Sequence, residues 1–99
     1  MSSNEIISVR DYFKTKPVIR VWLFGSHARG EETPNSDIDL LVVFDHDHAD
    51  IGLMEYAKMI NELSEKLGKP VDIVEEGTLL PFAKQSAEKD KKLIYERVG

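Results

Sequence analysis

The sequence predicts an α/β (α+β) fold, a small mixed β-sheet of about four strands covered on one face by helices. Stretches with helical periodicity alternate with short apolar runs rich in β-branched and aromatic residues. Their order is helix, strand, strand, helix, strand, helix, strand. The chain has 99 residues, 41% of them hydrophobic, which is enough for one modest core, so we expect a single domain over residues 1–99.

The first half of the chain predicts one helix and two strands. The helix covers Ser3–Phe13, where apolar residues recur at helical spacing and Ser2 or Ser3 can cap the amino end. Val18–Phe24 is rich in β-branched and aromatic residues and stops at Gly25, as a buried strand does. Asp37–Phe44 is the second strand, apolar after its first acids.

The second half predicts two helices and two short strands. An amphipathic helix over Ile51–Leu67 ends at Gly68, and a strand follows within residues 70–76. A further helix is expected over residues 79–87. Lys92–Glu96 predicts a last edge strand, with a continued helix as the alternative for that segment.

The charge balance disfavours a stable complex with nucleic acid. The chain has 18 acidic and 13 basic residues and a net charge of -5, which repels phosphate polyanions. No apolar run is long enough to span a membrane and the amino terminus lacks a secretory pattern, so we expect a cytoplasmic protein without membrane contact. The absence of cysteine fits that compartment and excludes disulfides and thiolate metal sites.

Asp37 and Asp39 alternate at the start of an apolar strand, and the period of two places both carboxylates on one side of the sheet. Alternating acids can serve solubility alone. However, aspartate is disfavoured in strands, and neighbouring like charges repel unless a cation neutralises them. Carboxylates whose α-carbons lie about 6.5 to 7 Å apart suit Mg²⁺, which combines one or two carboxylates with substrate phosphates. The pair therefore predicts a metal site for a phosphate-bearing substrate.

Gly25 and Ser26 predict the phosphate-binding part of the same site. Glycine at a strand end lets backbone amides approach an anion closely, and the Ser26 hydroxyl can donate one more hydrogen bond. Arg29 has two equal interpretations. It either contacts a phosphate or pairs with a nearby acid and holds the loop.

The segment GSHARGEETPNSDIDLLV resembles the signature of nucleotidyltransferase-fold proteins related to DNA polymerase β, a Gly-Ser pair followed about ten residues later by Asp-x-Asp. It is most similar to the minimal nucleotidyltransferases (MNT), which are often the antitoxin partners of HEPN ribonuclease toxins. The resemblance implies an enzyme that uses ATP, with two Mg²⁺ ions on Asp37, Asp39 and a third acid, which Asp72 matches. It further implies that Gly25 and Ser26 bind the triphosphate, and that Asp72 helps to orient or deprotonate the acceptor hydroxyl.

The same resemblance implies an acceptor on a partner protein, a tyrosine of a HEPN toxin that is AMPylated and thereby silenced. One alternative is a binding module that neutralises the toxin by occlusion, without catalysis. Another is nucleotidyl transfer to a small molecule such as an aminoglycoside, assisted by a separate helical subunit. A triad of acids favours catalysis over pure binding, and a homo-oligomer is left open.

Three other features have simpler interpretations. Asp45–Asp50 alternates acids with histidines, and a solvated loop in which Asp50 caps the next helix is favoured over a transition-metal site. Glu75 and Glu76 are interpreted as surface charges. Trp22 is interpreted as a core residue rather than a base-stacking platform.

Overall fold

The computed structural model describes residues 1–25, 28, 30, 33, 37–47, 50–75, 89 and 91–97. Within these residues, four strands form one sheet in the order β3-β2-β1-β4, with β1 at Val18–Phe24, β2 at Ile38–Phe44, β3 at Val71–Glu75 and β4 at Lys92–Glu96. β1 is antiparallel to both of its neighbours, and β3 is parallel to β2. The predicted mixed sheet is confirmed.

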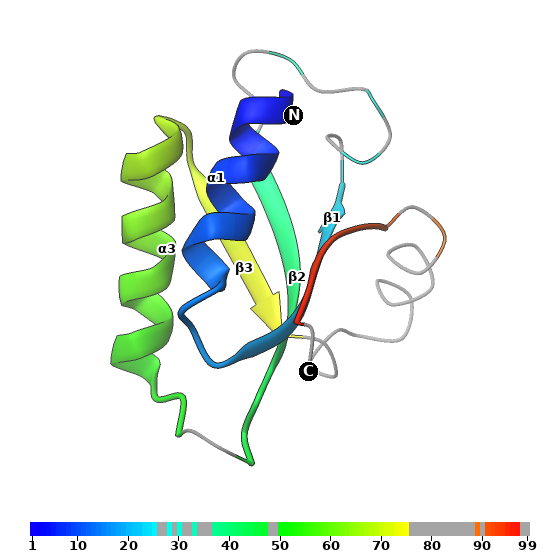
Figure 1. Ribbon diagram of the computed structural model, residues 1–99. Helices are drawn as coiled ribbons and strands as arrows, with labels where there is room; N and C mark the ends of the chain where they lie inside the picture. Colours follow the sequence, from blue (N-terminus) through cyan, green and yellow to red (C-terminus); the bar gives the residue numbers. More distant parts are fainter. Residues whose placement is uncertain are drawn as a thin grey trace.

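Two helices, α1 at Ser3–Phe13 and α3 at Leu53–Leu67, lie side by side on one face of this sheet (Figure 1). Each buries a pair of apolar side chains spaced by one helical turn, so that both helices present a narrow apolar stripe to the strands. These side chains and the inward residues of the sheet form one core, which includes Val9, Phe13, Val21, Leu23, Ile38, Leu40, Val42, Met59, Leu63 and Ile73.

A β-bulge near the start of β1 decides which of its residues face the helices. The register shifts between Val18 and Arg20, which leaves Ile19 as the additional residue of this strand. Val18 and Val21 are therefore both fully buried, while Trp22 lies on the opposite face and is partly exposed. The interpretation of Trp22 as a core residue is wrong.

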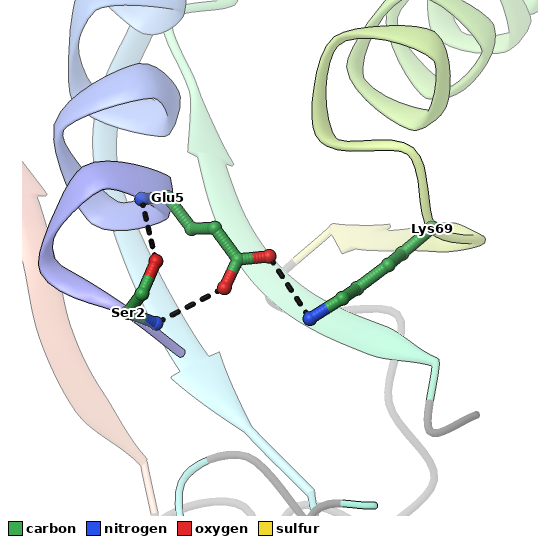
Figure 2. A network of polar contacts seen from close by, with 3 residues as sticks. All are labelled: Ser2, Glu5 and Lys69. Carbon is green, nitrogen blue, oxygen red and sulfur yellow. Dashed lines mark hydrogen bonds and ion pairs between the residues drawn. The ribbon is translucent and has the colours of Figure 1, made fainter. Parts of the chain in front are cut away.

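Side-chain contacts connect the amino end of α1 to the segment that precedes β3. Ser2 and Glu5 form a reciprocal capping box, and the Glu5 carboxylate also pairs with Lys69 at 3.1 Å (Figure 2). The Ser2 backbone N–H, followed by Lys69, holds the pKa of Glu5 below its ordinary value. This network connects two segments that are far apart in the sequence.

Two hydrogen bonds that involve backbone groups of Pro70 and Val71 fix the start of β3 more directly. The Val71 N–H donates to the Ser64 hydroxyl at 3.1 Å, which links the strand to the last turn of α3. The Ile38 N–H donates to the Pro70 carbonyl at 2.9 Å, which aligns the start of β3 with the start of β2. The beginning of β3 is thus fixed by contacts with both elements.

Most predicted boundaries agree with the structure. α1, β1 and β4 have their predicted bounds, and β4 is a strand rather than a continued helix. β2 begins at Ile38, one residue later than predicted, and α3 begins at Leu53 with Gly52 as its N-cap. The prediction that Asp50 caps this helix is therefore wrong. The predicted helix over residues 79–87 lies outside the described residues.

Candidate active site

Two acids meet where β2 and β3 begin. Asp39 and Asp72 are direct partners in the parallel register, so their α-carbons lie about 4.8 Å apart. The residues on either side of each acid are buried toward the helices, so both carboxylates project from the opposite face of the sheet. Asp39 is partly exposed and Asp72 is exposed, which leaves this pair accessible to a substrate.

Gly25 is packed directly against one of these acids. It follows Phe24, the cross-strand partner of Asp39, and has a φ of +73°. A Cβ atom at Gly25 would lie 2.6 Å from Oδ2 of Asp39 and 3.4 Å from its Cγ. Glycine therefore fits this position for two reasons, because its φ is rarely adopted by other residues and because a side chain would displace the carboxylate.

Of the other predicted site residues, Asp37 lies within the described residues. The chain turns after Gly25, with the buried Ala28 donating its N–H to the Gly25 carbonyl at 3.1 Å. Asp37 is exposed and precedes β2 by one residue. Ser26 and Arg29 lie outside the described residues, so their phosphate-binding roles stay predictions.

The carboxylates at this edge of the sheet fit Mg²⁺. Asp39 and Asp72 offer oxygen ligands from adjacent strands, and their like charges repel each other without a cation. Over the described ranges, no three Asp, Glu, His or Cys side chains converge on a point where they could hold a metal ion by themselves. This arrangement is compatible with Mg²⁺, which commonly takes one or two carboxylates and completes its shell with water and substrate phosphates.

The acids of β3 also affect a side chain of the neighbouring helix α3. Burial, and then the carboxylates of Asp72 and Glu75, raise the pKa of the Tyr56 hydroxyl. The same negative potential opposes the approach of a bare nucleotide triphosphate. A divalent cation at the acid pair would offset it.

Sequence reasoning missed a buried aspartate and its ion pair at the other end of β2. Asp45, which directly follows this strand, is only 3% exposed and pairs with Arg97 at 2.8 Å. The prediction of a solvated loop is thus wrong at this residue. Nearby, Nε2 of His46 lies 2.5 Å from Oε2 of Glu75. The Glu75 side chain is half-buried, so it is not the simple surface charge that the sequence predicted. Glu76 lies outside the described residues.

The chain matches known proteins over most of its length. The model of the nucleotidyltransferase domain family matches residues 6–94. The "Putative protein adenylyltransferase MJ1379" of Methanocaldococcus jannaschii is 40% identical over 88 residues, which are 88% of this chain and 82% of that protein. From the same organism, the "Putative protein adenylyltransferase MJ0128" is 38% identical over the same shares of both chains.

Solved structures show the same fold. A chain described as the "Structure of putative minimal nucleotidyltransferase" has a TM-score of 0.67 and 32% identity, with 90% of this chain and 85% of that chain covered. A chain from a crystal structure of a toxin-antitoxin pair with AMP-PNP has a TM-score of 0.75 and 22% identity, with 98% and 75% covered. A chain from the complex of a tri-AMPylated HEPN toxin of Shewanella oneidensis with its MNT antitoxin has a TM-score of 0.72 and 16% identity, with 98% and 74% covered.

The family match and the shared fold therefore define a nucleotidyltransferase. The chain belongs to the nucleotidyltransferase domain family. Along the described residues, no helix has both the length and the apolar character that crossing a membrane requires.

Proposed function

We propose that this protein is an Mg²⁺-dependent protein adenylyltransferase that moves AMP from ATP to a tyrosine hydroxyl of a HEPN-type toxin and thereby silences the toxin. The observation that carries the proposal is the cross-strand pair Asp39 and Asp72, with Gly25 packed against it at the end of β1. The relatives named as protein adenylyltransferases support the choice of AMP and of a protein acceptor.

In this reaction the tyrosine oxygen attacks the α-phosphorus of ATP. The bond between that phosphorus and the oxygen leading to the β-phosphate breaks, pyrophosphate leaves, and AMP stays on the tyrosine. Asp72 orients the attacking hydroxyl and accepts its proton, because it is the exposed member of the acid pair. Gly25 and Ser26 hold the triphosphate through backbone N–H groups and a hydroxyl, and Arg29 contacts the leaving pyrophosphate.

Asp37, Asp39 and Asp72 would hold Mg²⁺, with two ions expected from the family pattern. Bound there, the metal would neutralise phosphate charge and stabilise the attacking and leaving oxygens of an in-line displacement. The exposure of Asp37 and Asp72 and the partial exposure of Asp39 leave room for the water and phosphate ligands that Mg²⁺ requires.

The choice of partner is supported by the toxin-antitoxin structures that share the fold. One of them contains AMP-PNP, an analogue of ATP, and another contains a HEPN toxin that carries AMP. Because ATP is the donor, we place the reaction in the cytoplasm.

The test incubates the purified protein with α-³²P-labelled ATP, Mg²⁺ and a purified HEPN-type protein from the same organism, and follows label on the HEPN protein. Asp39→Asn and Asp72→Asn should each lower the rate about 100-fold or more, the effect of losing one electrostatic contact in an active site. Asp11→Asn, an exposed acid of α1 paired with Lys14, is the matched control and should leave the rate unchanged. The proposal is wrong if either site variant transfers label as fast as the parent.

A second readout separates catalysis from occlusion. Growth of cells that express the HEPN protein is measured with the parent and with both site variants. Growth rescued by the parent alone supports silencing by AMPylation. Equal rescue by the site variants would identify a module that acts by binding, and label on an added aminoglycoside would identify a small-molecule acceptor.

A further inference from the structure

We propose that the surface around the first turn of α3 docks an apolar, positively charged segment of the protein that is modified. This inference rests on the proposed function, because it concerns the same partner. The surface, called here the α3 entry surface, is a pocket of about 300 Å³ and the exposed side chains beside it. Its lining includes Phe44, His46, Ile51, Leu53, Tyr56 and Glu75.

The first argument is the exposure of large apolar side chains that the core does not use. Leu53 and Met54 are adjacent in sequence and are 83% and 84% exposed. The buried stripe of the same helix runs through Met59 and Leu63 instead. Beside Leu53, Phe44 and Tyr56 line the pocket with their rings 6.3 Å apart. An apolar side chain from a partner would therefore contact several apolar side chains here.

The second argument is the sign of the charge around the pocket. Glu75 lies on its wall, where it pairs with His46, and the exposed Asp47 follows His46 in the sequence. Asp50 and Glu55 are exposed on a neighbouring groove that shares Ile51 with the pocket; three acids, with Glu62, and two lysines, Lys16 and Lys58, line this groove. The Glu55 carboxylate lies close to the backbone of Gly52, which also lines the pocket. A lysine or arginine next to the apolar side chain of the partner would meet these acids, which gives charge complementarity.

A second copy of this chain is a poorer occupant than a basic partner. If two copies met through this surface about a two-fold axis, the acids of one copy would face the same acids of the other. The net charge of each chain is -5, so the repulsion would not be confined to the contact.

The α3 entry surface and the acid pair lie at different places on the molecule. Phe44 is five residues beyond Asp39 along β2, and Glu75 is three residues beyond Asp72 along β3, which places these walls of the pocket about 17 Å and about 10 Å from the two acids. The pocket lies beside α3, whereas the acids project from the other face of the sheet. A partner held at the α3 entry surface would leave the acid pair open to ATP, so losing this contact should raise the KM for the partner rather than lower kcat.

The test is the affinity of the purified full-length protein for the HEPN protein, measured by calorimetry without ATP. The double variant Leu53→Ser/Met54→Ser should bind at least about tenfold more weakly, because two apolar side chains lose their contact with the partner. The double variant Asp50→Asn/Glu55→Gln should bind at least about threefold more weakly than the parent, and most of this difference in affinity should disappear at 1 M salt. Ile7→Ser, which removes another exposed apolar side chain, on α1, is the control, and this variant should bind as the parent does.

A change of less than threefold in the Leu53→Ser/Met54→Ser variant would overturn the proposal, as would a parent that does not bind the HEPN protein. Dimers of the parent that dissociate in this variant would assign the surface to a second copy and would also overturn it. If the apolar variant does not fold, as judged by circular dichroism, the charge variant decides in its place. Binding that follows these expectations without transfer of label would refute the proposed chemistry alone.

Discussion

The most informative single substitution is Gly25→Ala, because the structure separates its effect on stability from its effect on the site. At a φ of +73° an alanine costs about 1 to 2 kcal/mol of backbone strain. For a domain of this size, each kcal/mol lowers the Tm by about 4 to 8 °C. The new Cβ would also lie 2.6 Å from Oδ2 of Asp39, and this oxygen must move by several tenths of an ångström. Since the oxygen is the end of a side chain that can rotate, this movement adds little to the loss of stability. It would displace a proposed metal ligand, however, and since a misplacement of about 1 Å in an active site can lower the rate about 100-fold, a shift of several tenths of an ångström should lower it about tenfold.

Gly68→Ala is the matched control for this experiment. Gly68 ends α3 with a φ of +66°, and a Cβ atom there would meet nothing within 4 Å. The two variants should therefore lose similar stability in thermal unfolding followed by circular dichroism, while only Gly25→Ala should lose transfer of label from α-³²P-ATP. Equal activity of the two variants would refute the reasoning that Gly25 leaves space for the Asp39 carboxylate.

Three further outcomes are expected. Arg97→Ala should lower the free energy of unfolding in urea by about 1 to 3 kcal/mol, because the buried carboxylate of Asp45 loses its ion pair with Arg97, and an unchanged urea midpoint would contradict this. The pKa of Glu5 is below its ordinary value of 4.5 in the folded protein, so its contribution to stability is present above that value and is lost as the pH falls through the folded pKa. Lys69→Met should therefore reduce the loss of stability as the pH falls below about 4.5, and it should do so only in part, because the Ser2 backbone hydrogen bond remains; an identical pH profile in urea unfolding would exclude the role of this ion pair. Removal of divalent cations with EDTA should stop label transfer, and added Mg²⁺ should restore it, whereas transfer that persists in EDTA would refute the metal site.

The sheet and one acid of the site follow from local patterns in the sequence. β-Branched runs gave the bounds of β1, and the period of two placed the Asp39 carboxylate on the face opposite to the buried Ile38 and Leu40. These predictions succeed because each depends on neighbouring residues along a single strand.

Two of the wrong predictions, those for Asp45 and Trp22, depend on structure beyond the local sequence. Asp45 is buried because Arg97, near the other end of the chain, neutralises it. Trp22 faces away from the core because the bulge at Ile19 shifts the alternation of β1, and the ammonium group of Lys91 lies 4.2 Å from the centroid of its ring. No local pattern of residues specifies a bulge or the distant partner of a buried charge.

The meeting of Asp39 with Asp72 has a simple geometric cause in the connection between their strands. β2 has seven residues and advances the chain by about 23 Å, whereas α3 has 15 residues and returns it by about 22 Å. Because the helix returns the chain over nearly the length of the strand, β3 begins level with the start of β2, and Val71 pairs with Ile38. The next residue of β3 is therefore opposite Asp39, so the length of α3, as well as its apolar stripe, determines that the two acids lie together.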